Sequence, residues 1–229
     1  MTERLEIVAV EDLSDFLKYL EENGMETGAF GFRGVPDPNY DLIPSIGRPT
    51  LRSDYEEYRE KQAFKWFRQA AMPFISRPPE HNMAWLAMAR HHGLPTRLLD
   101  WSLSPLVATF FAVADPPKGA NGFAVYSYES DFYLDPPDIL EPFDRAEELT
   151  EVHTDYYSDR MAAQRGFFAI HKTPDKPFRH ETLKKFIFPE SIRNDTMYRL
   201  DFYNINKSTL YPGLDGIGAH YAWFYSIIE

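Results

Sequence analysis

Two prolines divide the middle of this chain into helix, strand and helix. Gly93 suits the left-handed position just past a helix end, and Pro95 prevents that helix from continuing. Ser104 is a residue that caps helix starts, and Pro105 after it loses nothing in a first turn, where its missing N–H would have no partner. The sequence therefore predicts a helix that ends at Gly93, a strand over residues 96–101 and a helix that begins after Ser104.

Other elements follow from apolar periodicity and from turn residues. Residues 11–23 place their apolar side chains on one face, which predicts an amphipathic helix. Ser53 and Glu56 form a capping box, which predicts the start of a helix that runs to about Ala71. Strands are predicted over residues 29–35, 122–128, 167–171 and 183–188, helices over 158–165, 191–203 and 214–228, and a long acidic, proline-rich loop over 131–155.

The order of these elements indicates the fold class. Helices and strands are interspersed, but β-α-β crossover units do not repeat, so we predict an α+β fold with a mixed β-sheet covered by helices. The 229 residues, 44% of them hydrophobic, suffice for one well-buried core and are few for two. We therefore predict a single domain over residues 1–229, with a helical lead-in over 1–28 and a core over 29–229.

Composition excludes several classes of function. The chain has no cysteine, so disulfides, thiolate zinc sites and cysteine nucleophiles are ruled out. We see neither a signal peptide nor an apolar run of about 20 residues, the length that spans a bilayer, and we expect a cytoplasmic protein without membrane contact. The net charge of −11 argues against general nucleic-acid binding, but it permits a local basic pocket for a small anion.

Phe32-Arg33-Gly34, at the end of a predicted strand, is the first candidate site. The forked guanidinium of Arg33 can bind a phosphate or carboxylate through two hydrogen bonds. Gly34 would let a ligand approach the backbone closely, and Phe32 would flank it. The alternative is a structural arginine that is held by a buried carboxylate such as Asp100, and the sequence leaves both interpretations open.

The run from His91 to Ser102 is the second candidate site. On a strand, Asp100 and Ser102 share one face, while Arg97 and Trp101 share the other. A buried aspartate or arginine needs a partner or a function. We therefore take Asp100 as a candidate catalytic residue and Arg97, Trp101 and Ser102 as candidate ligand-binding residues, beside a helix start that would attract an anion. The alternative is that Asp100 only caps local backbone.

His92 and Gln164 complete the candidate catalytic residues. Histidines in a last helical turn interact favourably with free carbonyls, which is the plainer explanation of His91 and His92. Adjacent residues on a helix point about 100° apart, so the pair is poorly placed to hold one metal ion, and we expect no metal site. His92, which lies nearer the strand, is our candidate acid–base, and Gln164 is the weaker candidate because a glutamine at a helix end is usually just solvated.

Several motifs of the chain resemble the FRG domain family. They are GFRG at 31–34, LIPSIGR at 42–48, HHGLPTRLLDWS at 91–102, and Pro105, Ala108 and Phe111-Ala112, while QRGFF at 164–168 and PGLDG at 212–216 look like the family's C-terminal half. The resemblance covers nearly the whole chain, and the run at 91–102 is long and specific. The family has no settled biochemical activity, so the resemblance implies membership without a mechanism.

The order of the candidate strands also looks like the ADP-ribosyltransferase fold. In that superfamily an early arginine or histidine holds NAD, a second strand carries serine or threonine, and a late glutamate stabilises the reacting ribose. Arg33 and Ser102 would fill the first two roles, and only Gln164 lies near the place of the third, so no catalytic glutamate is identified. The likeness implies NAD as cofactor, with ADP-ribosyl transfer or NAD hydrolysis as the activity.

A non-catalytic binding module is the alternative function. The same pocket would bind a small anionic or nucleotide-like ligand without turnover, as a sensor in a stress or phage-defence system. A dinucleotide such as NAD would place its phosphates at Arg33 and its rings against Trp101 or Phe32. The missing glutamate favours this alternative, and the sequence identifies no protein partner.

Overall fold

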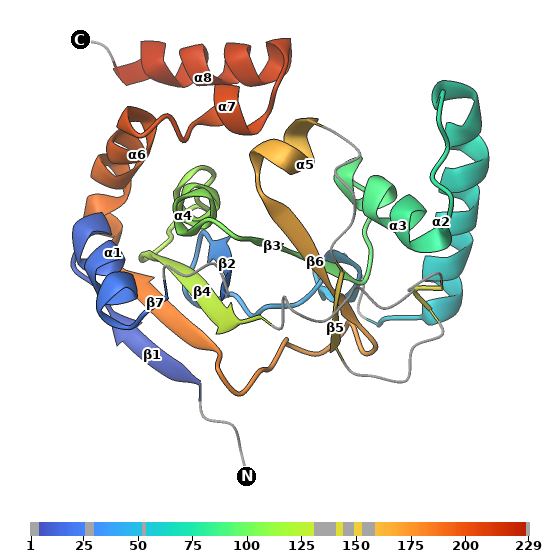
Figure 1. The fold of residues 1–229 in the computed structure, drawn as a ribbon, viewed down its shortest axis with the longest axis horizontal. Coiled ribbons are helices and arrows are strands. Elements are labelled where there is room, and N and C mark those ends of the chain that lie inside the picture. The colour runs from blue at the N-terminus through green and yellow to red at the C-terminus, as the bar shows by residue number, and fades with distance from the viewer. Residues whose placement is uncertain are drawn as a thin grey trace.

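Seven strands form one β-sheet in the computed structural model, which describes residues 5–25, 30–51, 54–130, 141–143, 149–152 and 159–227 (Figure 1). In sheet order the strands are β1 (Glu6–Ala9), β7 (Lys184–Phe188), β4 (Phe123–Glu129), β2 (Phe30–Val35), β3 (Leu98–Ser102), β6 (Gly166–His171) and β5 (Leu149–Val152). Strand β1 runs parallel to β7, and the other pairs are antiparallel. This mixed sheet confirms the predicted α+β class.

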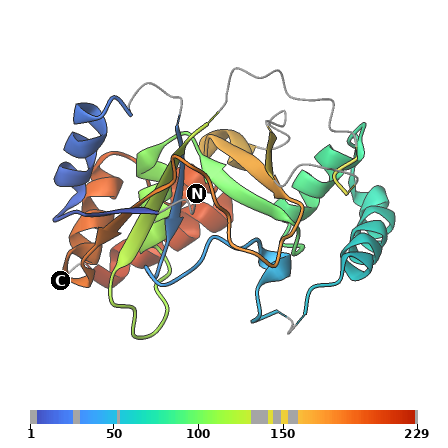
Figure 2. The same ribbon diagram turned by 90° about the horizontal axis from the view of Figure 1, so that it is seen from below.

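Helices lie at the two ends of the sheet and over its middle (Figures 1 and 2). They are α1 (Leu13–Glu22), α2 (Glu57–Ala71), α3 (Asn82–His91), α4 (Pro105–Val113), α5 (Asp159–Ala163), α6 (Arg193–Phe202), α7 (Lys207–Leu210) and α8 (Leu214–Ile227). Helices α1 and α6 lie beside the β1–β7 end, and α2 and α3 lie at the opposite end. The predicted helix–strand–helix order around Pro95 and Pro105 is confirmed as α3, β3 and α4.

Three clusters of buried apolar side chains join these layers. The first packs α1, α4 and α6 on β4 and β7, with Phe16 and Phe186 at its centre. The second packs α2 and α3 on β3 and β6 and contains Trp85 and Leu98. The third, around Trp101, lies on the other face of β3 and β4, because neighbouring residues of a strand point to opposite faces.

Helix α4 packs directly on β2 because Gly34 has no side chain. A Cβ at Gly34 would lie 1.9 Å from the carbonyl oxygen of Ala108 and 2.6 Å from the backbone nitrogen of Ala112. The helix starts as predicted, with Ser104 accepting a hydrogen bond from the backbone of Val107. The side of Gly34 on which a Cβ would lie is filled by helix backbone, and the role of Gly34 in binding a ligand stays a prediction.

Helix α2 begins later than the predicted capping box. Its N-cap is Glu56, whose side chain caps no backbone N–H and accepts a hydrogen bond from Nε of Arg59 at 2.6 Å. Ser53 lies outside the described residues. The first turn of the helix is held by a different contact, because Glu60 binds Arg97, which directly precedes β3.

Three short elements depart from the prediction. Strand β5 lies within the predicted loop 131–155, of which residues 131–140, 144–148 and 153–155 lie outside the described part. Strand β1 and helix α7 were not predicted. Each has only four residues, which is too few for periodicity to show, and β1 exists through pairing with β7, far away in the sequence.

Arg97 and Glu60 form a buried ion pair between β3 and α2, with each side chain only 2% exposed. Oε2 of Glu60 accepts hydrogen bonds from Nη2 of Arg97 at 3.0 Å and from Nε at 3.2 Å, and Oε1 accepts from the Arg97 backbone at 2.9 Å. The Tyr55 hydroxyl also donates to Glu60, at 2.6 Å. The pair therefore fixes α2 against the sheet.

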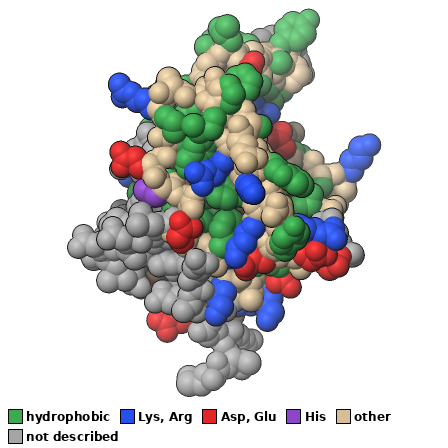
Figure 3. All heavy atoms as spheres, turned by 90° about the vertical axis from the view of Figure 1, so that its right-hand side faces the viewer, with side chains coloured by type: hydrophobic (Ala, Val, Ile, Leu, Met, Phe, Trp, Pro, Cys, Tyr) green, Lys and Arg blue, Asp and Glu red, His purple; other side chains and the backbone are tan. Residues whose placement is uncertain are grey.

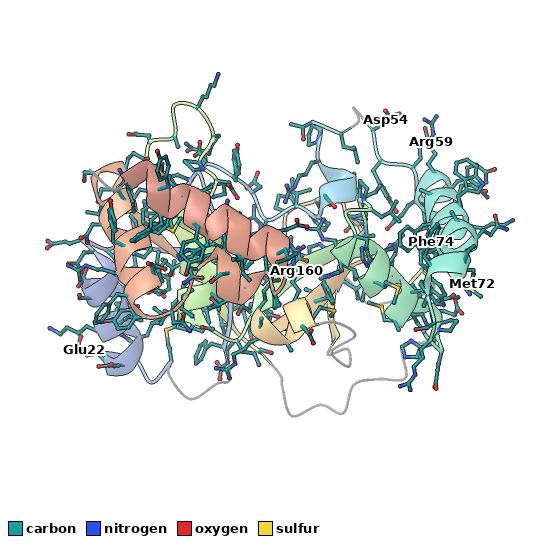
Figure 4. The ribbon with its side chains drawn as sticks, turned by 90° about the horizontal axis from the view of Figure 1, so that it is seen from above. Glu22, Asp54, Arg59, Met72, Phe74 and Arg160 are labelled. Atoms are coloured by element: carbon teal, nitrogen blue, oxygen red, sulfur yellow. The ribbon has the colours of Figure 1, made fainter. Side chains whose placement is uncertain are left out.

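The surface at the α2 end mixes exposed apolar side chains with Lys, Arg and acidic groups (Figure 3). Trp66 and Phe74 are both largely exposed there, and Figure 4 shows Phe74 and Met72 at that end of the molecule. Arg59 and Lys61 each pair with a glutamate of the same helix. Two of the positive charges on this face are thus balanced locally, while Lys65 and Arg68 make no described ion pair.

We expect Glu60→Gln to lower the free energy of unfolding by about 3 kcal/mol, because it leaves the Arg97 guanidinium buried without its main counter-charge. This value is at the low end of the usual range because Glu57 still accepts from Arg97, at 3.3 Å. The matched control is Glu56→Gln on the same helix, which breaks an exposed pair and should cost less than about 1 kcal/mol. Urea unfolding followed by tryptophan fluorescence measures both, and equal midpoints for the two variants would contradict the prediction.

Gly34→Ala should lower the free energy of unfolding by about 3 kcal/mol, since the added Cβ forces α4 away from β2. Gly218→Ala in α8 is the control, because a Cβ there meets no atom within 4 Å and alanine is the better helix former. We expect the control to be as stable as the wild type or slightly more so. Thermal melts of both variants provide the measurement, and a Gly34→Ala protein as stable as the wild type would show that the helix does not need this contact.

Candidate functional site

Strands β2 and β3 part from each other beside the candidate residues. They pair at a single register, Phe32 opposite Ser102, whereas β2 pairs with β4 along its whole length. A cavity of about 1070 Å³ is lined by residues of both strands, by the end of α3, by the segment 39–50 and by parts of α4 and α5. The cavity thus lies between the first and second apolar clusters.

Most of the predicted site residues line this one cavity. They are Phe32, Arg33, Gly34, His92, Asp100, Trp101, Ser102 and Gln164. Phe32 and Trp101 do so from within the core, because each is only 2% exposed. The Trp101 ring packs against Tyr128 and Phe178, with ring centroids 4.5 and 5.1 Å apart, so the ring surface that we expected a ligand to use is occupied by protein.

Arg97 is the exception among the predicted binding residues. It does not line the cavity, because its side chain turns toward α2 and is enclosed by Glu60, Glu57 and Tyr55. The expectation that Arg97 binds a ligand is therefore corrected to a structural role.

Asp100 is held between two arginines that come from different elements. Arg90, at the end of α3, donates from Nη2 to Oδ2 at 2.6 Å and from Nε to Oδ1 at 3.3 Å. Nη1 of Arg33 lies 3.5 Å from Oδ2 and also donates to the carbonyl oxygen of Asp100. Arg33 is thus held by Asp100, as the structural interpretation required, and its side chain, 14% exposed, still lines the cavity.

Arg90 also fixes the segment that forms the outer wall. Its Nη1 donates to Oγ of Ser45 at 2.8 Å, and that oxygen accepts from the backbone of Thr96 at 3.3 Å. Ser45 begins a short 3₁₀ turn, Ser45–Gly47, and Arg48 follows it. The wall therefore positions Arg48 beside the Arg33–Asp100–Arg90 group.

Charge at this group is unbalanced. Burial alone would raise the pKa of the Asp100 carboxyl, but Arg90 and Arg33 outweigh it and hold that pKa well below its usual range. Burial lowers the pKa of Arg33 to about 10 against the opposing effect of Asp100, with Arg90 and Arg48 lowering it too. Burial and the charge of Arg90 also lower the pKa of Arg48. Three guanidinium groups thus share one carboxylate and repel each other.

A fourth arginine, Arg160 of α5, lines the cavity away from this group. Its guanidinium lies 4.2 Å from the centroid of the Tyr211 ring, and its Nε is buried without a described hydrogen-bond partner. In Figure 4 the labelled Arg160 lies near the middle of the molecule, between α8 and α3. Sequence reasoning assigned no role to Arg160, Arg90 or Arg48, although Arg48 stands in the family-like run 42–48 and Arg90 directly precedes His91.

His91, His92 and Gln164 differ in their exposure and in their contacts with the rest of the protein. His91 is half-buried and His92 exposed, and their rings lie 5.1 Å apart, nearly perpendicular. Burial, with Arg160 and His92, lowers the pKa of His91. Nε2 of Gln164 donates to the carbonyl oxygen of Leu210 at 3.0 Å and so attaches α7. The catalytic roles of His92 and Gln164 stay predictions.

Ser102 also makes a structural contact. Its Oγ donates to the carbonyl oxygen of Gln164 at 2.8 Å and accepts from the backbone of Ser104 at 3.1 Å.

Within the part of the chain that the structure describes, no group of three or more His, Asp or Glu side chains is placed to hold a metal ion. None of the described helices is long and apolar enough to cross a membrane.

Asp100→Asn should lower the free energy of unfolding at pH 7 by about 1–2 kcal/mol, less than a buried charged pair because the Asp100 side chain is 44% exposed within the cavity. The pKa of Asp100 lies lower in the folded than in the unfolded chain, where it is about 3.9. The stabilisation by the Asp100 carboxylate is therefore present above about pH 4 and is lost as the pH falls further. Urea unfolding at pH 7 and below pH 4 measures it, with exposed Asp41→Asn as control. A difference between wild type and Asp100→Asn that grows as the pH falls would contradict the prediction.

Comparison with known proteins bears on the half of the cavity that β2 and β3 form. The model of the FRG domain family matches residues 28–121, which include Arg33, Arg48, Arg90 and Asp100. The match ends before Arg160, and the likeness of the later motifs to this family stays a prediction. No curated protein and no solved structure is detectably similar to the chain. Residues 28–121 of the chain are thus identified as an FRG domain.

Proposed function

We propose that the cavity binds a small phosphate-bearing anion of the nucleotide class. The observation that carries this proposal is the charge of the lining. Among the described residues, the charged side chains there, histidines aside, are four arginines, Arg33, Arg48, Arg90 and Arg160, and two aspartates, Asp41 and Asp100. Such a lining attracts anions in a protein whose net charge is −11.

The local balance of charge favours a dianion. Three guanidinium groups, those of Arg33, Arg90 and Arg48, surround the single carboxylate of Asp100. Asp100 neutralises one of them, so two positive charges remain. A phosphate monoester carries nearly two negative charges at pH 7 and matches the planar fork of arginine. Arg48 is the best-placed ligand residue, because its Nε donates to the carbonyl oxygen of Ile43 at 3.0 Å and its two amino groups make no described hydrogen bond.

NAD is the first dinucleotide to test. Ligand sites usually enclose about 300–1000 Å³, and the cavity of about 1070 Å³ is large enough for a dinucleotide. The ring-bearing parts would contact Tyr40 and Phe111, since Phe32 and Trp101 belong to the core.

ADP-ribosyl transfer or NAD hydrolysis is the second candidate function. It is favoured by one observation, the presence of a carboxylate, Asp100, and an imidazole, His92, in the same cavity as Arg33. The described lining residues include no glutamate to stabilise a reacting ribose. Binding without turnover is therefore the function that we propose first.

Calorimetric titration of the full chain with NAD, ADP-ribose and AMP tests the proposal. We expect binding at millimolar concentration or below, and we expect Arg48→Ala to weaken it by about 1.5–3 kcal/mol, the usual value of a charged hydrogen bond. The affinity of Arg48→Lys should lie between those of the wild type and Arg48→Ala, because lysine keeps the charge and loses the forked guanidinium. Arg59→Ala, at an exposed position of α2, is the control and should bind like the wild type.

Two outcomes would decide against parts of this proposal. Absence of binding for every one of these ligands at millimolar concentration would overturn it. Release of nicotinamide from NAD by the wild type, followed by chromatography and lost in Asp100→Asn, would show turnover and favour the second candidate.

A further inference from the structure

One oxygen of Asp100 is open to a ligand within the basic cavity. Oδ2 receives Nη2 of Arg90 at 2.6 Å, Nε of Arg90 at 3.2 Å and Nη1 of Arg33 at 3.5 Å. Oδ1 receives Nε of Arg90 at 3.3 Å, a donor that it shares with Oδ2, and the backbone N–H of Asp100 also bonds to the carboxylate. The Arg90 contact at Oδ1 is long and the side chain is 44% exposed, so Oδ1 has room for another donor.

The charge state of Asp100 decides what that donor is. The arginines hold the pKa of the carboxyl well below its usual range against the effect of burial, so the group is ionised whenever the protein is near neutral pH. An ionised carboxylate only accepts hydrogen bonds, and it repels a phosphate. The part of a ligand that meets Oδ1 must therefore be an uncharged or cationic donor.

We propose that Asp100 is a specificity-determining residue that accepts a hydrogen bond from a ligand hydroxyl, so that the cavity selects phosphorylated ribose, as in a nucleotide, over phosphate alone. The inference rests on the proposed function, because it assumes that the arginines bind the phosphate. A ribose phosphate fits both requirements, since it carries hydroxyls a few bonds away from its phosphate.

Arg48 and Asp100 line the same cavity, and each lies within range of the other's charge. The pKa of Arg48 responds to the charges of both Arg90 and Asp100, and all three side chains line the cavity. A phosphate at Arg48 and a hydroxyl at Oδ1 would therefore belong to one small molecule. Asp41, the other described carboxylate of the lining, is not in a described ion pair with a cavity arginine.

A purely structural role for Asp100 predicts a different result. If Asp100 only held Arg33 and Arg90 in place, its replacement would weaken all phosphate ligands by the same factor. If Asp100 binds a hydroxyl, its replacement weakens only the ligands that carry one. The ratio of two affinities, rather than either affinity alone, separates these roles.

The experiment compares AMP with 2′,3′-dideoxy-AMP, and with inorganic phosphate as the hydroxyl-free probe, by calorimetric titration of the full chain. We expect the wild type to bind AMP about tenfold more tightly than the dideoxy compound, the effect of one hydrogen bond to a charged group. In Asp100→Asn the ratio should fall below about threefold. In Asp41→Asn, the same chemical change in the same cavity, the tenfold ratio should persist.

Each other outcome has a defined meaning. Equal binding of AMP and dideoxy-AMP by the wild type overturns this inference and leaves the proposed function standing. A tenfold ratio that survives in Asp100→Asn, or that is lost in Asp41→Asn, also overturns it. Failure of all three probes to bind overturns the proposed function, and this inference with it. If Asp100→Asn does not fold, the ratios of the wild type and Asp41→Asn decide.

Discussion

The bridge from Arg33 through Asp100 to Arg90 lets the sheet open without leaving polar groups unpaired. Where β2 and β3 part after one register, a carbonyl of β3 loses its strand partner, and a buried unpaired carbonyl is costly. The Arg33 guanidinium supplies a donor to the carbonyl oxygen of Asp100, and Arg90 neutralises the adjacent carboxylate. The cavity depends on this bridge, since stronger pairing of the two strands would close the space between them. The same bridge concentrates positive charge at the cavity wall.

The succession of Phe32, Arg33 and Gly34 is explained by three different neighbours. Phe32 enters the core under α4, Gly34 admits the backbone of α4, and Arg33 turns to the cavity. Within β3 the carboxylate of Asp100 is exposed to the cavity, whereas Trp101, which also borders it, packs its ring into the third core cluster. Strand alternation produces this division, and it explains how a short motif serves both packing and a site.

The sequence predicted the elements that carry strong local signals, such as α3, β3 and α4, whose bounds are set by glycine, proline and serine. It missed β1 and placed the start of α2 too early, because both depend on partners distant in the chain. The same limit applies to the site. The Arg33–Asp100 contact was one of two open interpretations, but Arg90 looks like any cation at a helix end. Arg97 was misassigned because nothing in the sequence of α2 marks Glu60 as its buried partner, and only tertiary packing shows the pair.

Charge distribution connects the acidic composition with the basic cavity. At physiological ionic strength, charges more than about 8–10 Å apart are largely screened, so a small anion inside the cavity responds mainly to the arginines around it. A polyanion tens of ångströms long would lie along the surrounding surface as well, and there the net charge of −11 repels it. At the α2 end Arg59 and Lys61 pair with Glu56 and Glu57, whereas Lys65 and Arg68 make no described ion pair. An arginine-lined cavity in a chain of net negative charge therefore favours small anions before any specific hydrogen bond is made. Recognition of a hydroxyl by Asp100 would add a second, short-range criterion, which acts only on ligands that have already entered.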